Sequence, residues 1–462
     1  MTDVSLGRTK DGAAARSATD LYRAVWRWHF YAGLLVLPFL VSLAITGGLY
    51  LFHDEIDAIV HADLKRVEIA EGAAPVAPSA MVAAALSAVP GTAVKYTDPT
   101  DPGASAEITV VTADAGKIAV YVDPHDGRVL GTLPDRGTVM WTIRTLHSLK
   151  YFGTTARTLI EIAGGWAILL VATGLYLWWP RRQGGGVVTV RGAPRNRIFW
   201  RDTHAVTGLF VGGFIVFLAV TGMPWSGVWG GKVNEWANGS NFGYPAGVRT
   251  EVPMSDARLA ESGPTTWSLE QARVPESSAP DSADPAPIGI DRAVAITDGL
   301  GLARGYALAL PAGPTGVYTA SVYPDDLSQQ RVVHLDQYSG KPLLDMSYAD
   351  YGPLGRAMEW GINTHMGQEF GLANQLVLLA ACMAIVLLAV SAAVMWWKRR
   401  PKGSLGVPPV PQDKRVLRGV IGILAIGGIV FPLVGLSLIV MVALDLVVVR
   451  SFGGSRGPAG AA

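Results

Sequence analysis

Long apolar stretches without a charged side chain constrain this chain more than any other feature. In chain order they occupy residues 28–52, 162–179, 205–231, 370–397 and 419–444, of which the second is slightly shorter than the others. A helix needs about 20 apolar residues to cross the hydrocarbon core of a bilayer. Half of the 462 residues are hydrophobic and only 16% are charged, so we expect an integral membrane protein embedded in a lipid bilayer. The first stretch is too long for a signal-peptide core and lacks a small-residue cleavage site, which favours a retained anchor.

Basic residues beside the apolar stretches predict the two sides of the membrane. Short loops rich in Lys and Arg stay in the cytoplasm, and such loops precede the first stretch, join the second to the third and follow the fourth. The predicted organisation is a cytoplasmic N-terminal arm (1–27), span 1 (28–52), an outside domain (53–158), span 2 (159–179), a basic cytoplasmic loop (180–202), span 3 (203–225), a second outside domain (226–369), span 4 (370–397), a basic cytoplasmic loop (398–418), a C-terminal span or hairpin (419–449) and a tail (450–462). The side on which the C-terminus lies stays open.

The chain also contains an internal duplication. The matched positions are Met140/Met358, His147/His365, Phe152/Phe370 and Trp178/Trp396, each 218 residues apart, and His29/His204, Thr46/Thr221 and Gly47/Gly222, each 175 residues apart. Two spans separate the copies, so they should have the same orientation and be related by an axis along the membrane normal. The predicted fold class is an integral membrane α-helical bundle, with four core spans as two parallel repeats and a C-terminal span or hairpin.

The outside regions share a second similarity. Residues 120–130 and 333–343 each predict a strand, a turn and a second strand, because Asp and Gly supply the turn and alternating apolar residues supply half-buried strands. Upstream, residues 78–89 suit a short helix. Each outside region is therefore expected to form a small α+β domain.

Charge and cysteine content exclude several kinds of function. The formal net charge is +1 and basic runs occur only beside apolar spans, which argues against a nucleic-acid partner. Cys382 is the single cysteine. The chain therefore has too few cysteines for a disulfide framework, a zinc knuckle or a cysteine-ligated iron–sulfur cluster. Redox chemistry would have to use other groups.

Four of the eight histidines occupy corresponding places in the two copies. His29 and His204 stand at the cytoplasmic starts of spans 1 and 3, whereas His147 and His365 stand on the outer side before spans 2 and 4. Haem iron takes two axial ligands from opposite directions, and imidazoles on facing helices can supply them while the porphyrin fills the space between. This arrangement predicts two b-type haems, one near each membrane face.

Other interpretations of these residues exist. Single histidines at such depths often lie at the membrane interface, as Trp and Tyr do. His53 is a substitute ligand candidate, while His61, His125 and His334 are expected to be solvated.

The Thr46-Gly-Gly and Thr173-Gly motifs suit either close helix packing or space for a porphyrin face. Three further cations near the outer face could neutralise haem propionates or be ordinary solvated charges: Arg144, Lys150 and Arg157.

The sequence resembles the PepSY-associated transmembrane helix family over nearly its whole length. The resemblance rests on Trp26-Arg-Trp-His-Phe-Tyr-Ala-Gly-Leu34, Leu146-His-Ser-Leu149, Thr173-Gly-Leu-Tyr-Leu-Trp-Trp-Pro-Arg181, Arg201-Asp-Thr-His-Ala-Val-Thr-Gly208 and Thr364-His-Met-Gly367. The Asp-containing hairpins at 123–127 and 336–340 look like the ends of PepSY domains. Position 392 is Ala where its counterpart is Gly174, a departure that concerns only helix packing.

The resemblance implies a haem-dependent ferric reductase of the bacterial inner membrane, with a cytoplasmic N-terminus. It would pass electrons outward to a ferric siderophore or another periplasmic acceptor for iron acquisition. His29 and His204 would hold the inner haem, and His147 and His365 the outer one. No Gly-x-Gly-x-x-Gly fingerprint lies between a strand and a helix, so the donor would be a cytoplasmic reductase, a reduced flavin or a quinol. No acid or base catalyst is required for electron transfer.

Two alternatives belong to other functional classes. The outside modules could bind periplasmic peptides or proteases without redox chemistry, with the spans serving only as anchors. A transporter with repeats about a central site would need charged residues deep in its spans, and the first four apolar stretches contain none.

Overall fold

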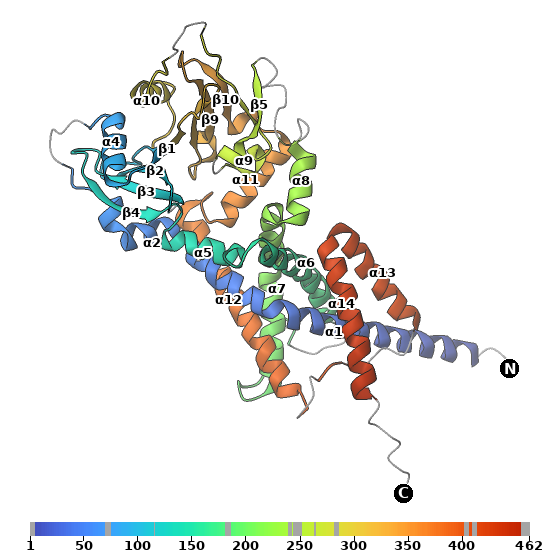
Figure 1. Cartoon of the computed structure of the whole chain (residues 1–462). Helices are drawn as coiled ribbons and strands as arrows, with labels where there is room; N and C mark the ends of the chain where they lie inside the picture. Colours follow the sequence, from blue (N-terminus) through green and yellow to red (C-terminus); the bar gives the residue numbers. More distant parts are fainter. Residues whose placement is uncertain are drawn as a thin grey trace. The chain divides into compact units, whose positions relative to one another are not determined.

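The computed structural model describes residues 5–69, 75–114, 116–180, 186–238, 243, 252–262, 265–280, 286–401, 406–408 and 414–453. The chain divides into two compact units. The helical unit comprises Met1–Gly48, His147–Gly230 and Leu379–Ala462, and the sheet unit comprises Leu49–Leu146 and Gly231–Leu378. Figure 1 labels the helices and strands of both.

Within the part of the chain that the structure describes, four helices are long and apolar enough to cross a membrane. They are α1 (Ser5–Tyr50), α6 (Thr154–Trp178), α7 (Arg197–Gly222) and α12 (Gly371–Arg399), which confirms the four predicted core spans. Residues from all four form one apolar core, which includes Val36, Trp166, Val211 and Ile385. Other apolar side chains of the same helices are exposed, among them Leu34, Phe210 and Leu387, as expected of helices that face lipid.

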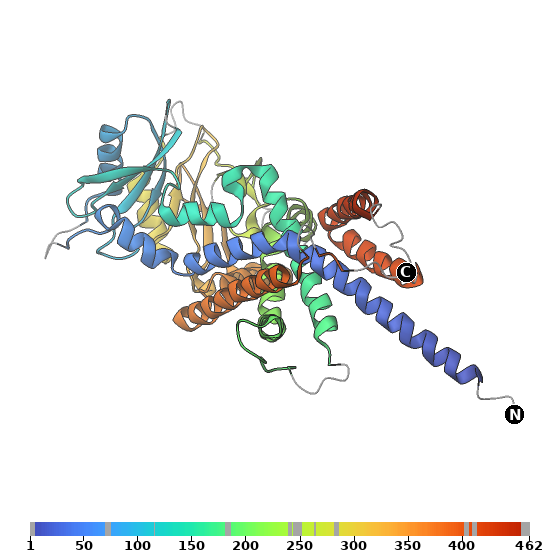
Figure 2. The ribbon, with the colours of Figure 1, turned by 90° about the horizontal axis from the view of Figure 1, so that it is seen from below.

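The C-terminal apolar stretch folds as two helices. α13 (Lys414–Val430) ends just before Pro432, which begins α14 (Pro432–Gly453), because proline has no N–H to continue a helix. Gly428 and Gly435 let the two backbones approach so closely that a Cβ added to Gly428 would lie 2.6 Å from the Gly435 Cα. Figures 1 and 2 show α13 and α14 side by side, so of the two predicted arrangements the hairpin is the one that forms.

The sheet unit contains one eight-stranded antiparallel sheet in the order β10-β9-β8-β7-β1-β2-β3-β4. Its strands are β1 (Thr92–Thr97), β2 (Ala106–Thr112), β3 (Gly116–Val122), β4 (Val129–Pro134), β7 (Ala307–Ala309), β8 (Val317–Val322), β9 (Arg331–Asp336) and β10 (Pro342–Ser347). Both predicted strand-turn-strand segments are confirmed, as β3–β4 and β9–β10. β1 pairs with β7, where Tyr96 lies opposite Leu308. The two regions predicted to lie outside, which the sequence presents as separate small domains, are therefore joined through one continuous sheet.

Two helices cover this sheet and build its core. α4 (Pro78–Ala88), which the sequence predicted, and α10 (Ile290–Gly299) pack Ala85, Ala293 and Val294 into a cluster with Tyr96 and Leu308. The smaller elements of the unit are α2 (His53–Val60), α3 (Ala62–Lys65), α5 (Val139–His147), α8 (Val228–Asn238), α9 (Leu259–Ser262), α11 (Pro353–His365), the two-stranded pair β5 (Met254–Arg258) and β6 (Arg273–Pro275), and the 3-10 turns η4 (Trp267–Leu269), η5 (Leu327–Gln329) and η6 (Tyr348–Asp350). α5 and α8 each extend into the helical unit, which also holds the turns η1 (Lys150–Phe152) and η2 (Met223–Trp225).

Candidate functional site

His29 of α1 and His204 of α7 lie together in the helical unit. Their ring centroids are 6.4 Å apart and the ring planes make an angle of 81°. A histidine nitrogen binds a metal at about 2.0–2.1 Å, so two imidazoles on opposite sides of one ion have ring centres roughly 6 Å apart. The structure thus brings this predicted pair together, at a separation that one six-coordinate iron can bridge.

Each of the two rings is oriented by a second helix. The Nδ1 of His29 is 2.9 Å from the Thr173 Oγ1 on α6, and the Nδ1 of His204 is 3.1 Å from the Leu388 carbonyl on α12. The Thr173 hydroxyl donates its own hydrogen to the Leu169 carbonyl, so its oxygen accepts from the imidazole. Both histidines therefore carry the proton on Nδ1 and leave a lone pair on Nε2, the arrangement that metal-binding histidines commonly show.

The duplication extends to these orienting groups. Ser391 lies 218 residues after Thr173, and its Oγ is 3.5 Å from the His204 Nδ1. The Ser391 side chain is fully buried. Both copies thus place a small hydroxyl residue of the following membrane helix next to the inner histidine.

His147 has an equivalent environment. It is the last residue of α5, and its Nδ1 is 2.9 Å from the Thr46 Oγ1 on α1, whose hydroxyl donates to the Ser42 carbonyl. A Cβ added at Gly47 would lie 3.3 Å from the His147 Cε1, and one added at Gly174 would lie 3.4 Å from the His29 Cε1. The Thr-Gly motifs therefore have a specific use that sequence reasoning missed: the threonine orients an imidazole and the glycine makes room for its ring.

His365 ends α11 in the sheet unit and is half-buried. The Asn374 amide donates to the carbonyl of the preceding Thr364 at 3.1 Å, which ties the end of α11 to α12. His147 belongs to the helical unit, and its pairing with His365 stays a prediction.

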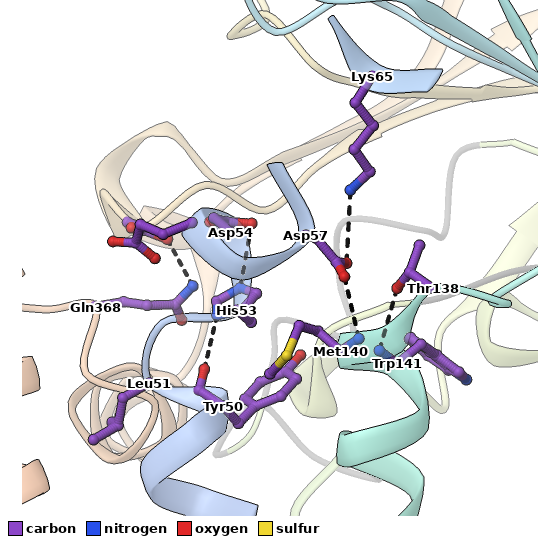
Figure 3. Close-up of polar contacts among 12 residues, drawn as sticks. Tyr50, Leu51, His53, Asp54, Asp57, Lys65, Thr138, Met140, Trp141 and Gln368 are labelled. Atoms are coloured by element: carbon purple, nitrogen blue, oxygen red, sulfur yellow. Dashed lines mark hydrogen bonds and ion pairs between the residues drawn. The ribbon is translucent and has the colours of Figure 1, made fainter. Parts of the chain in front are cut away.

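The remaining histidines have structural partners. His53 stacks on Tyr50 with 4.6 Å between the ring centroids. Its Nδ1 is 3.0 Å from the Tyr50 carbonyl, a contact drawn as a dashed line in Figure 3. His125 is half-buried, with its Nε2 2.9 Å from the Pro102 carbonyl. The prediction that His334 is solvated is wrong: the side chain is fully buried in the sheet, where its Nδ1 lies 2.9 Å from the Thr319 Oγ1. It is buried because both faces of β9 are covered: every residue from Val332 to Asp336 is buried, and His334 lies opposite Thr319 of β8.

The N-terminus of α5 is held by three side chains of the sheet unit, His61, Asp57 and Thr138, of which Figure 3 shows Asp57 and Thr138. The Val139 N–H donates to the His61 Nε2 at 3.2 Å, the Met140 N–H to the Asp57 carboxylate at 3.1 Å, and the Trp141 N–H to the Thr138 Oγ1 at 3.2 Å. These bonds satisfy the N–H groups that have no partner within a helix. They also correct the prediction that His61 is solvated, because its ring is largely buried and accepts a backbone N–H.

Glu161 is a buried carboxylate that the apolar pattern did not reveal. It directly precedes the stretch at 162–179 and lies inside α6, fully buried. Its Oε2 accepts the N–H groups of Val228 and Trp229 at the start of α8, at 3.0 and 3.1 Å. A carboxylate is favourable at a helix N-terminus.

Two of the predicted propionate partners also have other contacts: Arg157 donates to the Trp225 carbonyl, and Arg144 lies over the Trp141 ring.

The described residues contain no group of three or more His, Cys, Asp and Glu side chains that could hold a metal ion through protein ligands alone. A haem iron needs only two such ligands. No curated protein matches the chain. The model of the PepSY-associated TM region matches residues 26–399, from the start of the first span to the end of the fourth. The chain therefore belongs to the family of membrane proteins with a PepSY-associated transmembrane region.

Proposed function

We propose that this protein is a di-haem b-type electron-transfer protein of the bacterial inner membrane that reduces a ferric siderophore or a similar ferric complex on the periplasmic side. The observation that carries the proposal is the pair His29 and His204, with rings 6.4 Å apart and both Nδ1 atoms bound to acceptors. No hydrogen bond of either Nε2 is found within the described ranges. Two neutral imidazoles in this state suit the axial positions of one iron.

The second haem rests on the duplication. His147 has the same Thr-bound Nδ1 as His29, and His365 is its counterpart in the other copy. A haem bound at each pair would supply one-electron redox chemistry at both ends of the bundle. The protein residues would orient the rings through Thr46, Thr173 and the Leu388 carbonyl.

The direction of electron flow follows from the basic residues that predict a cytoplasmic N-terminus. One electron from a cytoplasmic reductase, a reduced flavin or a quinol would cross the bundle and reduce Fe(III) to Fe(II) outside. Reduction favours iron release, because the hard oxygen ligands of siderophores suit Fe(III) better than Fe(II).

The decisive experiment is an optical spectrum of the detergent-purified protein, oxidised and dithionite-reduced, with a pyridine haemochrome assay. We expect two b-type haems per chain. Single alanine substitutions at His29, His204, His147 and His365 should each remove or alter one haem, whereas the matched control His125→Ala should leave both unchanged. A colourless protein from haem-replete cells would contradict the proposal and favour a membrane-anchored module that binds peptides or proteases.

A further inference from the structure

The segment between α6 and α7 and the end of α12 concentrate positive charge in the helical unit. In residues 186–202 and 398–401 the charged side chains are Arg191, Arg195, Arg197, Arg201, Asp202, Lys398, Arg399 and Arg400. Cations thus outnumber anions strongly here, although the formal net charge of the whole chain is only +1. A surface of this kind attracts negatively charged partners over a distance and speeds their association.

Hydrogen bonds attach this basic segment to two membrane helices. The Trp178 Nε1 at the end of α6 donates to the Val187 carbonyl at 2.8 Å. The Lys398 Nζ at the end of α12 donates to the Arg195 carbonyl at 3.0 Å. The backbone of the segment is therefore held in place, whereas the attraction of a basic segment to lipid headgroups requires only a cluster of charges.

Asp202 neutralises part of the positive charge at the start of α7. Its carboxylate is fully buried and accepts from the Arg191 Nε at 2.8 Å and from the Arg201 Nη2 at 2.6 Å. One carboxylate thus fixes two guanidinium groups and balances one of them.

Arg195 and Arg197 carry charge that the described part of the chain does not balance. Both side chains are exposed, and neither forms an ion pair with a described residue. Arg197 is also close enough to Arg399 for the two positive charges to repel each other. An anion that binds beside Arg197 would relieve this repulsion.

The same segment exposes apolar side chains. Val188 is 57% and Val190 42% exposed. Apolar residues and arginine together are typical of protein interfaces, whereas a small phosphate compound would need only the cations. The combination favours a protein as the partner.

We propose that Arg195, Arg197, Val188 and Val190 form a docking surface for a small acidic electron-carrier protein, which delivers electrons to the inner haem. The inference rests on the proposed function, and it selects a protein from among the donors considered there. His204 follows Arg197 by seven residues in α7, a rise of about 10.5 Å along the helix axis. A carrier docked at the start of α7 would give up one electron, and Fe(III) held between His29 and His204 would become Fe(II).

The first test measures docking without electron transfer. Full-length protein in phosphatidylcholine nanodiscs is titrated by calorimetry with an oxidised plant-type [2Fe–2S] ferredoxin, an acidic one-electron carrier. We expect Arg195→Gln/Arg197→Gln to bind it about tenfold more weakly than the wild type at low salt, and with a weaker salt dependence. Arg292→Gln, at an exposed arginine of the sheet unit, should bind like the wild type.

The second test follows haem reduction by stopped-flow spectroscopy. The double variant should accept electrons from reduced ferredoxin about tenfold more slowly at low salt, and from duroquinol, a neutral quinol, at a rate within about twofold of the wild type. Its haem spectrum should be unchanged, because neither arginine contacts a predicted iron ligand.

Four outcomes decide between the explanations. Arginine-dependent ferredoxin binding by a protein without haem would support the docking surface and refute the proposed function. Equal ferredoxin binding by the wild type and the double variant would refute the surface, and a loss of bound phosphatidylglycerol in native mass spectra would then assign the two arginines to lipid headgroups. An equal fall of both reduction rates, or an altered haem spectrum, would also refute it.

Discussion

At the level of single residues, threonines on neighbouring helices orient two of the predicted ligands. Thr173 binds the His29 Nδ1 at 2.9 Å and Thr46 binds the His147 Nδ1 at the same distance. Each threonine also donates to a carbonyl of its own helix, which fixes the direction of the hydroxyl hydrogen. The hydrogen bond to the threonine therefore fixes which imidazole nitrogen carries the proton, and the metal bound at the other nitrogen does not decide it.

Thr173→Val should loosen the inner haem without removing it. Valine has nearly the same volume but cannot accept the Nδ1 hydrogen, and loss of such an orienting partner lowers metal affinity about 10–100-fold. Haem transfer from the purified protein to apomyoglobin would measure the loss, and Thr173→Ser should transfer haem at the wild-type rate. Equal rates for all three proteins would show that the contact has no role in haem binding.

Glu359 predicts how the stability of the sheet unit depends on pH. Burial raises the pKa of this carboxyl to about 7 from an ordinary value of 4.5, although the Ser268 N–H and hydroxyl both donate to it. The unfolded chain then releases this proton at lower pH than the folded chain does. The contribution of this carboxyl to the free energy of unfolding is complete below about pH 4.5 and is lost as the pH rises through about 7. The total loss is at most about 3 kcal/mol.

Glu359→Gln removes the charge but keeps an oxygen that can accept from Ser268. We expect it to raise the melting temperature at pH 8 and to change it little at pH 4.5, as measured by thermal unfolding. Glu235→Gln, at an exposed carboxylate, should have no effect at either pH. An equal shift of the Glu359→Gln protein at both pH values would contradict the raised pKa.

At the level of elements, the helices could be predicted from the sequence more fully than their contacts. A run of about 20 apolar residues has few alternatives to a membrane helix, so the four spans followed directly. The hydrogen bonds from Thr46 and Thr173 depend on how helices pack, and Thr-Gly motifs suit ordinary packing equally well. Glu161 was missed because it lies at the edge of its apolar stretch and because its partners, the N–H groups at the start of α8, are distant in the sequence.

The C-terminal hairpin predicts that both of its ends lie on the same side of the membrane. α13 begins after a basic segment that is expected to be cytoplasmic, so a reporter fused after Gly453 should also be cytoplasmic. Fused green fluorescent protein should fluoresce there, and fused alkaline phosphatase should be inactive. A phosphatase fusion after Ser347, in the region expected outside, is the matched control and should be active. Active phosphatase after Gly453 would indicate a single kinked span.

At the level of the whole molecule, the continuous sheet changes the expected behaviour of the two outside regions. The repeats predicted two similar modules, and each does form a four-stranded half of the sheet, β1–β4 and β7–β10. Their union through β1 and β7 could not be predicted, because β7 has only three residues and nothing local specifies its partner. The apolar core is shared, since Tyr96, Val120, Leu308 and Val333 belong to one cluster.

A shared core predicts that the two halves unfold together. Leu308→Ala, at a fully buried position of β7 opposite Tyr96, should cost about 2–5 kcal/mol. Hydrogen exchange followed by mass spectrometry should then show faster exchange in β2 and β3 as well as in β8 and β9, because exchange from a cooperative core reports one opening free energy. Val129→Ala in the edge strand β4, where the side chain is half-buried, should act only locally. Faster exchange confined to β7–β10 in Leu308→Ala would mean that the halves are independent domains, and the β1–β7 pairing would then contribute little to the stability of the unit.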